Sequence, residues 1–349
     1  MELKEIIPVP AKKKSKARAI LLFSGGLDSA LAGLVLQEAG VEVIPLTFKS
    51  PFFGYENALK LAEQLNWPLV VADITEEQLR IVEKPKYGYG KNMNPCIDCH
   101  AQMARIACSL LRKYNADFVA TGEVLNERPK SQNRRALEIV AEESGCGGLL
   151  LRPLSAKLLP PTEPELKGIV DRSKLLDISG RSRKRQFELA KRYGLKNYPT
   201  PAGGCLLTDP VFSAKLRKIL KWRGFLDPED IALVRFGRNF FESNYWIVVS
   251  RNEMETRAME KLPLTDDILI TMAEVPGPLT VVRFKEKSPP QEAVEEAIRI
   301  ASLLTIRYSK ARDFEKASVR VTAASSEKVI TYNRAEWQPF FEKPYLPQF

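Results

Sequence analysis

The feature that most constrains this sequence is a short apolar segment, residues 19–23, which runs directly into Ser24-Gly-Gly-Leu-Asp-Ser29. Residues 30–38 follow with the spacing of a helix, and Gly40 stands where that helix would end. A buried strand, a turn with two adjacent glycines and a helix, in this order, are typical of the start of a parallel α/β sheet. We therefore expect the N-terminal half of the chain to build such a sheet.

The alternation of strands and helices continues beyond this loop. The sequence predicts strands over 41–48, 69–72 and 117–121, and helices over 56–65 and 97–114. This pattern predicts the α/β class, with a Rossmann-like parallel sheet that carries helices on both faces. Ligands of such sheets bind outside the carboxyl ends of the strands, here at the loops that follow Phe23, Phe48 and Thr121.

A length of 349 residues suggests two domains. Residues 1–18 are a Lys-rich basic segment that we expect to be mobile or to lie at a sheet edge. The first domain is expected over 19–225, and Asp227-Pro228 indicates the boundary. Beyond it we expect a smaller α+β domain over 226–349, with a helix at 290–308 and strands at 318–322 and 328–332.

The apolar runs of this chain are short. None approaches the ~18–20 residues needed to cross a bilayer. The first 20 residues also lack the apolar core of a secretory signal. We therefore expect a cytoplasmic protein that has no membrane partner.

Positive charge is concentrated in one stretch. The chain has 53 Lys and Arg against 43 Asp and Glu, and residues 152–223 alone hold 17 basic and 6 acidic side chains. Such a surplus favours a polyanion such as RNA, although a solvated helical face would have the same composition. The candidate RNA contacts lie around a helix predicted at 183–193 and are Arg181, Arg183, Lys184, Arg185, Lys191 and Arg192.

The loop at 24–29 has a composition suited to phosphate. Gly25 and Gly26 allow the backbone N–H groups to approach a ligand, and the start of the following helix favours an anion. Ser24 and Ser29 add hydroxyl groups, while Asp28 would bind Mg²⁺ or assist the chemistry. The loop therefore indicates ATP binding, and the structural alternative is a tight strand-to-helix turn.

Three of the five cysteines are candidate ligands. Cys96 and Cys99 form a Cys-x-x-Cys pair at a predicted helix start, and Cys205 follows two glycines. Three thiolates suit a 4Fe–4S cluster with one open iron, a persulfide that another thiol resolves, or zinc with His100 as fourth ligand. The odd number of cysteines makes a disulfide framework unexpected. Cys108 is predicted to lie in the core, and Cys146 is left open.

At these residues the chain resembles the PP-loop ATP pyrophosphatase superfamily, whose members adenylate a substrate and release pyrophosphate. The resemblance covers about residues 19–210. Thr121-Gly-Glu-Val-Leu, Ser131-Gln132 and Leu151-Arg-Pro-Leu154 are similar to segments of tRNA 4-thiouridine synthetases and, more distantly, of tRNA 2-thiouridylases. The resemblance implies that the loop residues hold the ATP phosphates and that Thr47, Phe48 and Gly122 line the adenosine pocket.

One branch of these tRNA thiolases has a three-cysteine iron–sulfur site beside the ATP pocket. The resemblance therefore implies a 4Fe–4S cluster on Cys96, Cys99 and Cys205, with Asp28 and these cysteines as the catalytic residues. In contrast to the named synthetases, only 18 residues precede the first predicted strand, so RNA and sulfur would have to arrive by other routes.

The second domain resembles a different family. Phe236-Gly-Arg-Asn, Val249-Ser-Arg-Asn, Pro276-Gly-Pro and Tyr308-Ser-Lys are similar to motifs of the RNA-associated domain called NFACT-R. The resemblance implies that this domain contacts RNA. The candidate contacts in it are Arg238, Arg251, Arg283 and Lys310.

Together these expectations describe an ATP-dependent tRNA sulfurtransferase. It would adenylate a nucleobase carbonyl, of uridine or of cytidine, and replace the oxygen with sulfur from sulfide or a donor protein, releasing AMP and pyrophosphate. One alternative is a PP-loop ligase or sulfur transferase for a small molecule. Another is a non-catalytic RNA-binding protein with structural zinc. A homodimer is compatible with each of them.

Overall fold

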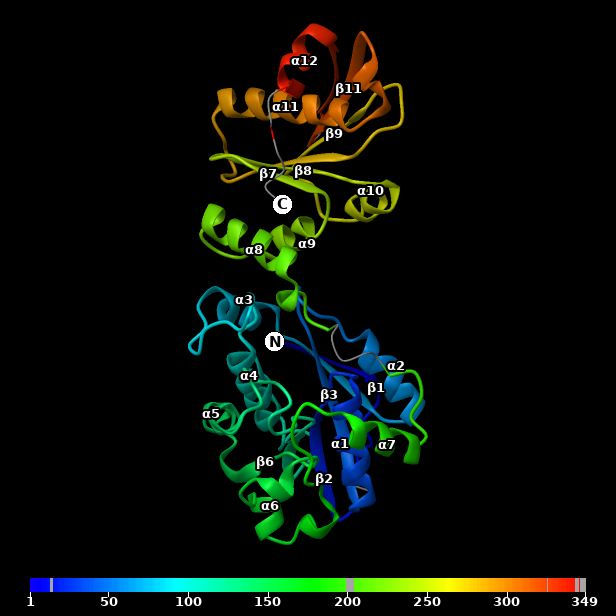
Figure 1. The fold of residues 1–349 in the computed structure, drawn as a ribbon, viewed down its shortest axis with the longest axis vertical. Helices are drawn as coiled ribbons and strands as arrows, with labels where there is room; N and C mark the ends of the chain where they lie inside the picture. The colour runs from blue at the N-terminus through cyan, green and yellow to red at the C-terminus, as the bar shows by residue number, and fades with distance from the viewer. Residues whose placement is uncertain (13–14, 199–203, 325, 343–344, 346–349) are drawn as a thin grey trace. The chain divides into compact units, whose positions relative to one another are not determined.

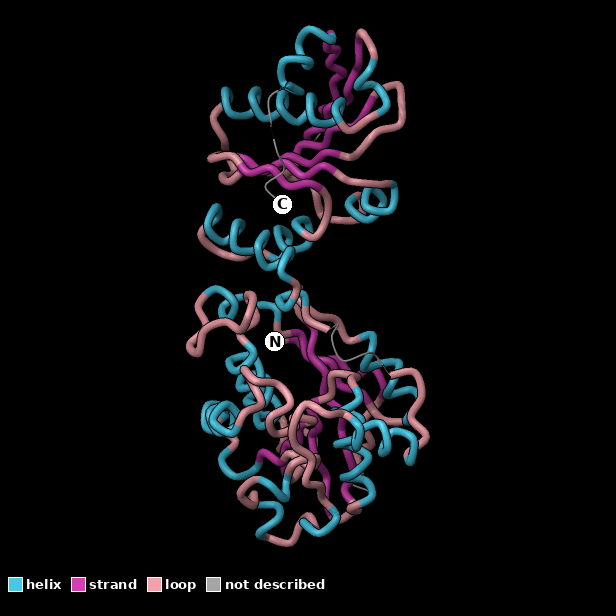
Figure 2. Tube along the Cα trace, in the orientation of Figure 1, coloured by secondary structure: helices cyan, strands magenta, loops and turns pink. Residues whose placement is uncertain are grey.

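A computed structural model describes residues 1–12, 15–198, 204–324, 326–342 and 345 of the chain. The chain folds into two compact units, residues 1–209 and 210–349, whose elements are drawn in Figures 1 and 2. Within the described ranges, no helix combines the length and the apolar character that crossing a membrane requires.

The first unit is built on a six-stranded sheet with the order β1-β4-β3-β2-β5-β6. Its strands are β1 (Glu2–Ile7), β2 (Ala17–Leu22), β3 (Val41–Lys49), β4 (Leu69–Asp73), β5 (Phe118–Thr121) and β6 (Leu150–Leu151). All pairs are parallel except that of β1 with β4. The predicted parallel sheet is therefore confirmed.

Helices cover both faces of this sheet (Figure 1). The core on one face includes Leu21 with residues of α1, α2 and α7, and the core on the other includes Ile20 with residues of α4 and α5. Alternate residues of β2 thus serve opposite faces. The helices of this unit are α1 (Leu27–Glu38), α2 (Glu56–Leu65), α3 (Thr75–Glu83), α4 (Cys96–Ser109), α5 (Arg134–Ser144), α6 (Glu163–Leu166) and α7 (Lys184–Arg192), with 3₁₀ turns η1 (Gly147–Leu149), η2 (Ala156–Leu158), η3 (Arg172–Lys174) and η4 (Leu206–Thr208).

The basic N-terminal segment belongs to the sheet. β1 is its antiparallel edge strand, one of the two expectations for residues 1–18. Arg18 is buried in β2, where Nη2 lies 3.0 Å from Glu42 Oε1 and Nη1 donates to the Tyr114 carbonyl at 3.0 Å. This arginine is a structural residue of the first unit, since its donors are used inside it.

The second unit is an antiparallel sheet with the order β12-β11-β9-β10-β8-β7. α11 packs on one face, where Ile247 and Val249 of β8 share a core with Ala301 and Leu304. The strands are β7 (Arg238–Phe241), β8 (Tyr245–Val249), β9 (Ile268–Met272), β10 (Thr280–Phe284), β11 (Lys316–Ala323) and β12 (Ser326–Asn333). The helices are α8 (Pro210–Arg223), α9 (Pro228–Val234), α10 (Glu253–Met259), α11 (Gln291–Arg307) and α12 (Arg334–Glu342), with the 3₁₀ turn η5 (Lys310–Asp313).

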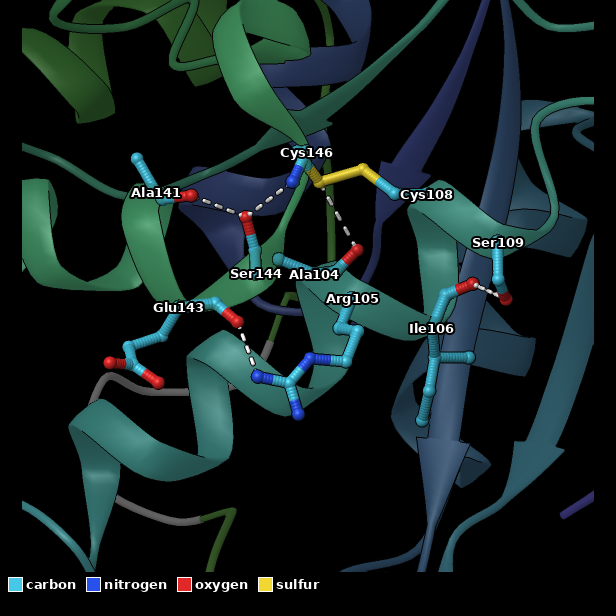
Figure 3. The surroundings of a disulfide bond; sticks show 9 residues. All are labelled: Ala104, Arg105, Ile106, Cys108, Ser109, Ala141, Glu143, Ser144 and Cys146. Carbon is cyan, nitrogen blue, oxygen red and sulfur yellow. Dashed lines mark hydrogen bonds between the residues drawn. A yellow bond between two sulfur atoms is a disulfide. The ribbon is translucent and has the colours of Figure 1, made fainter.

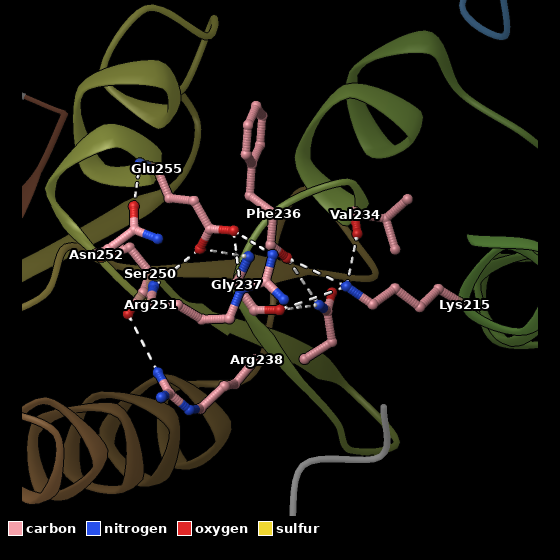
Figure 4. Close-up of polar contacts among 10 residues, drawn as sticks. Lys215, Val234, Phe236, Gly237, Arg238, Ser250, Arg251, Asn252 and Glu255 are labelled. Carbon is pink, nitrogen blue, oxygen red and sulfur yellow. Dashed lines mark hydrogen bonds and ion pairs between the residues drawn. The ribbon is translucent and has the colours of Figure 1, made fainter. Parts of the chain in front are cut away.

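The division between the units precedes α8, whereas the sequence pattern placed it after residue 225. The packing of α8 explains the difference. Trp222 contacts Trp246 edge to face and donates Nε1–H to the Glu242 carbonyl at 2.7 Å. The buried Lys215 ammonium donates to the carbonyls of Val234 and Gly237 at 3.2 and 3.4 Å (Figure 4). Cations of α8 that counted toward the basic stretch therefore stabilise the second unit.

Arg283, a candidate RNA contact, is buried instead. Its Nη1 lies 3.0 Å from Asp230 Oδ1, and its Nη2 lies 2.7 Å from Asp267 Oδ2. Arg223 pairs with Asp230 as well. The prediction for Arg283 was wrong because helix α9 and the turn before β9 supply carboxylates that the local sequence around it does not contain.

We expect Arg283→Met to lower the free energy of unfolding of the second unit by about 3–5 kcal/mol, because it leaves Asp267 as an uncompensated buried charge. Arg320→Met is the control, since Arg320 forms an exposed pair with Glu327 at 3.5 Å and should cost less than about 1 kcal/mol. Urea unfolding followed by tryptophan fluorescence measures both. Equal losses would show that the buried network contributes no more than a surface pair.

Candidate functional site

Three loops meet at the carboxyl edge of the first sheet. Leu22, the last residue of β2, pairs with Leu46 of β3 on one side and with Thr121 of β5 on the other. The chain segments that begin at Phe23 and Gly122 therefore leave the sheet at the same level, and β3 continues beside them to Lys49. The prediction of a ligand site at these loops gains its geometric basis from this register.

Two glycines allow these loops to touch. A Cβ atom on Gly25, which has φ +73°, would lie 2.3 Å from the Ala58 backbone nitrogen at the start of α2. A Cβ atom on Gly122 would lie 2.5 Å from the Ser29 backbone nitrogen. Any side chain at either position would therefore force backbone segments apart, which explains why glycine stands at both.

The turn at 24–29 presents polar groups at the start of α1. Ser29 Oγ donates to the Gly26 carbonyl at 2.8 Å, and the Gly26 N–H donates to Ser24 Oγ at 3.3 Å. Gly26 is the N-cap of α1, and no side chain in the described part of the chain caps this helix. An uncapped helix N-terminus at the edge of a parallel sheet favours an anion such as phosphate.

Asp28 faces a cation from α7. Arg183 Nη2 lies 3.3 Å from Asp28 Oδ2, and Arg183 Nε lies 3.7 Å from Glu127 Oε1. Burial raises the pKa of Asp28 above its ordinary value, against the opposing charge of Arg183. Burial and then the charge of Asp28 raise the pKa of Glu127. The two carboxyl groups thus lie close together, with the Arg183 guanidinium between them and the charge of Arg128 within reach of both.

The residues around Asp28 fit Mg²⁺. Asp28 Oδ1 is buried and has no hydrogen-bond partner among the described residues. Carboxylate oxygens are the protein ligands that Mg²⁺ prefers, usually together with substrate phosphates. Asp28 therefore has a buried acceptor, unpartnered among the described residues, within the turn at 24–29.

The residues predicted for the adenosine pocket differ in their surroundings. Thr47 and Phe48 are both buried at the end of β3. The Phe48 ring lies in the core on the α4 face, with Ile20 and Ile97. Gly122 packs against Ser29, as described above. All three residues lie at the carboxyl edge of the sheet, and the Phe48 side chain packs in the core.

The three predicted cysteine ligands come together, although Cys205 is far from the others in sequence. Cys96 and Cys99 begin α4, and Cys205 precedes η4, whose Leu206 N–H donates to the Phe52 carbonyl at 3.0 Å. Burial, and then Cys205 and Cys96, raise the pKa of Cys99. Burial raises the pKa of Cys205 to about 12, and Cys96 adds to the effect. The three thiols therefore lie within electrostatic reach of one another.

Carboxamide groups contact two of these sulfurs. Asn94 Nδ2 donates to Cys96 Sγ at 3.1 Å, and Cys99 Sγ donates to Gln78 Oε1 at 3.4 Å. Gln78 is 1% exposed, and its Nε2 has no partner within the ranges that the structure describes. The Asn94 donor fits an anionic sulfur ligand, whereas Gln78 presents its carbonyl oxygen to the Cys99 thiol. Nevertheless, no group of three His, Cys, Asp or Glu side chains in the described residues has metal-binding geometry.

His100 takes part in a buried ionic chain that sequence reasoning missed. Its Nδ1 lies 2.8 Å from Glu123 Oε1, and Arg152 Nε donates to Glu123 Oε2 at 2.9 Å. Burial alone would raise the pKa of Glu123, but Arg152 and His100 outweigh it and lower the pKa to about 2. Both Glu123 and Arg152 stand in the segments that resemble tRNA thiolases, and this was the signal available. One nitrogen of His100 is thus committed to Glu123, not to a thiol-bound metal.

The candidate RNA contacts fall into three groups. Arg183 is only 12% exposed and faces Asp28, so it does not lie on the same surface as the others. Arg185 pairs with Asp177, and Arg192 pairs with Glu38. The remaining candidates, Arg181, Lys184 and Lys191, are exposed.

Cys108 and Cys146 form a disulfide, with their Cα atoms 5.7 Å apart (Figure 3). This corrects the expectation that disulfides are absent. The bond joins the last part of α4 to the turn after α5, because these two helices pack against each other and bring the distant cysteines together. Cys146 Sγ also contacts the Ala104 carbonyl at 3.5 Å.

We expect Cys146→Ser to lower the free energy of unfolding by about 3–4 kcal/mol, because the bond closes a loop with a sequence separation of 38 residues. Urea unfolding with and without a reductant tests this. Reductant should destabilise the natural chain and leave the variant unchanged. A natural chain that is insensitive to a reductant able to open buried disulfides would contradict the expectation.

Two family models match separate parts of the chain. Residues 14–157 match the family described as "Thiamine biosynthesis protein (ThiI)". Residues 237–342 match the family described as "NFACT protein RNA binding domain". Cys205 and the basic helix α7 lie outside both ranges.

Curated relatives match part of the chain. The tRNA-specific 2-thiouridylase MnmA of Amoebophilus asiaticus is 29% identical over an alignment of 183 residues, and the match covers 44% of this chain and 48% of the relative. The MnmA of Cytophaga hutchinsonii is 33% identical over an alignment of 144 residues, and the match covers 34% of this chain and 38% of the relative. The chain thus spans about half, or less, of these relatives.

Among solved structures, the U34-tRNA thiolase NcsA from Methanococcus maripaludis, described "with its [4Fe-4S] cluster", is similar at 19% identity. The match covers 54% of this chain and 62% of NcsA, with a TM-score of 0.32. By family model, residues 14–157 and 237–342 match the two families that their motifs resemble, those described as "Thiamine biosynthesis protein (ThiI)" and "NFACT protein RNA binding domain".

Proposed function

We propose that this protein is an ATP-dependent tRNA sulfurtransferase that replaces a nucleobase carbonyl oxygen with sulfur. The observation that carries the proposal is that three thiols, Cys96, Cys99 and Cys205, lie within electrostatic reach of one another in the same unit as the turn at 24–29. Thiol groups and a nucleotide site together suit a reaction in which a carbonyl is first activated and then attacked by sulfur.

In the first step, the turn at 24–29 and the N-terminus of α1 would hold the ATP phosphates. The base carbonyl oxygen attacks the α-phosphorus, and pyrophosphate leaves. Asp28, with Mg²⁺, would orient the phosphates, and Arg183 would offset the charge that develops on them. This step turns a poor leaving oxygen into AMP.

In the second step, sulfide attacks the activated carbon, and AMP departs with the former carbonyl oxygen. Cys96, Cys99 and Cys205 would hold a 4Fe–4S cluster, which supplies an open iron position for sulfide when it is bound. Asn94 would donate an N–H group to the Cys96 sulfur, and Gln78, whose Nε2 has no partner among the described residues, would turn its carboxamide to donate to Cys99. The raised pKa of the Cys205 thiol means that such binding releases protons.

Anaerobic purification with iron and sulfide analysis, followed by incubation with tRNA, ATP, Mg²⁺ and sulfide, tests the proposal. Mass spectrometry of digested nucleosides should detect a thiolated base whose amount depends on ATP. Pyrophosphate release that requires a small molecule and ignores tRNA would favour the small-molecule ligase. RNA binding without pyrophosphate release would favour a non-catalytic protein.

A further inference from the structure

Helix α7 places an aromatic ring in solvent between two cations. Phe187 is 47% exposed, and Lys184 and Lys191 lie one turn before and one turn after it. Residues three and four apart share a face of a helix, so the three side chains lie along one exposed strip. Glu188 is also exposed on this helix and is its one acidic residue.

This strip lies next to the nucleotide loop. The Arg183 guanidinium carbon is 5.5 Å from the centre of the Phe187 ring, and Arg183 Nη2 is 3.3 Å from Asp28 Oδ2. One side chain therefore separates the exposed ring from the carboxylate of the phosphate-binding turn. A base that rests on Phe187 would be beside the nucleotide that reacts.

The cations of the strip are available for an anion. Within the described residues, Lys184 and Lys191 form no ion pair, whereas Arg185 and Arg192 of the same helix are paired with Asp177 and Glu38. Phosphate groups spaced along an RNA strand would match lysines on either side of a ring. A protein partner would be expected to cover the ring with apolar side chains, and the flanking charges disfavour that.

We infer that the strip formed by Lys184, Phe187 and Lys191 binds single-stranded tRNA, with Phe187 stacked on a base beside the modified nucleotide. The inference rests on the proposed function. A carbonyl inside a stacked helix cannot reach the α-phosphorus, so the target base leaves the stack. Exposed aromatic rings receive such unstacked bases, and nearby lysines hold the backbone.

The full chain with Phe187→Ala tests the ring, and Phe187→Trp tests its replacement by another aromatic. Leu166→Ala is the matched control, because Leu166 is 74% exposed on α6 of the same unit. The probe is an in vitro transcribed tRNA, used in titrations for Kd and in thiolation assays for KM and kcat. Phe187→Ala should raise Kd and KM about tenfold and Phe187→Trp less than twofold.

A second measurement addresses the lysines. Lys184→Gln with Lys191→Gln should reduce the slope of log Kd against log salt by about two, and Leu166→Ala should leave it unchanged. Equal Kd and KM for Phe187→Ala and Leu166→Ala would overturn the inference while the natural chain still thiolates tRNA. A natural chain that neither binds nor thiolates tRNA would overturn the proposed function as well, so the two failures are distinguishable.

Discussion

Cys205→Ser should abolish formation of thiolated nucleosides, with a loss of at least a hundredfold, while ATP-dependent pyrophosphate release with tRNA falls less than threefold. The reason is that Cys205 lies with Cys96 and Cys99 and not in the phosphate-binding turn. A serine oxygen is a poor ligand for iron, and it cannot carry a persulfide. The measurements are nucleoside mass spectrometry and pyrophosphate release on the same samples.

Cys146→Ser is the control for this prediction. It also replaces a cysteine by serine, but it affects the disulfide with Cys108. It should lower stability and leave the yield of thiolated nucleoside per folded molecule within twofold of the natural chain. Normal thiolation by Cys205→Ser would contradict the assignment of the three thiols to the sulfur-transfer step.

Asp28→Asn should reduce pyrophosphate release at least a hundredfold, and thiolation with it. The substitution keeps the shape of the side chain and removes the charge that would bind Mg²⁺ and that now pairs with Arg183. Iron content should stay unchanged, because the thiols are not altered. Asp28→Asn should lose pyrophosphate release, whereas Cys205→Ser should keep it and lose thiolation. This difference would separate the activation step from the sulfur-transfer step.

Asp177→Asn is the matched control for Asp28→Asn, since Asp177 pairs with Arg185 on the surface at 2.6 Å. It removes the same charge and should change pyrophosphate release less than twofold. Substantial pyrophosphate release by Asp28→Asn at saturating Mg²⁺ would contradict the role of this carboxylate.

Local pattern predicted much of the first unit. Helix α2 begins and ends at the predicted residues, and β3 extends one residue beyond its predicted end. Helix α4 ends at Ser109, five residues before its predicted end at Tyr114. The register that aligns Phe23, Thr47 and Gly122 at one edge follows from parallel pairing. Helices and strands whose apolar residues recur at a regular spacing were predicted well, because each of them buries its apolar face against a neighbouring element.

The predictions that differed from the structure concern charged side chains whose partners stand elsewhere in the sequence. Arg183 is part of a basic run, yet it faces Asp28, which is 155 positions away. Arg283 was predicted to contact RNA, yet Asp230 and Asp267 pair with it in the interior. In both cases the sequence shows the charge of the side chain, but it does not show which residue is the counter-ion.

The sequence by itself determined the parallel sheet and the strand–turn–helix order around residues 24–29, because short segments encode strand, turn and helix through periodicity and glycine. Only the tertiary structure decided that Cys108 bonds Cys146, that Glu123 joins His100 to Arg152, and that α8 packs in the second unit. The physical reason is that bonds, ion pairs and burial depend on which chain segments meet in space, and a local pattern carries no information on a partner that lies tens of residues away in the sequence.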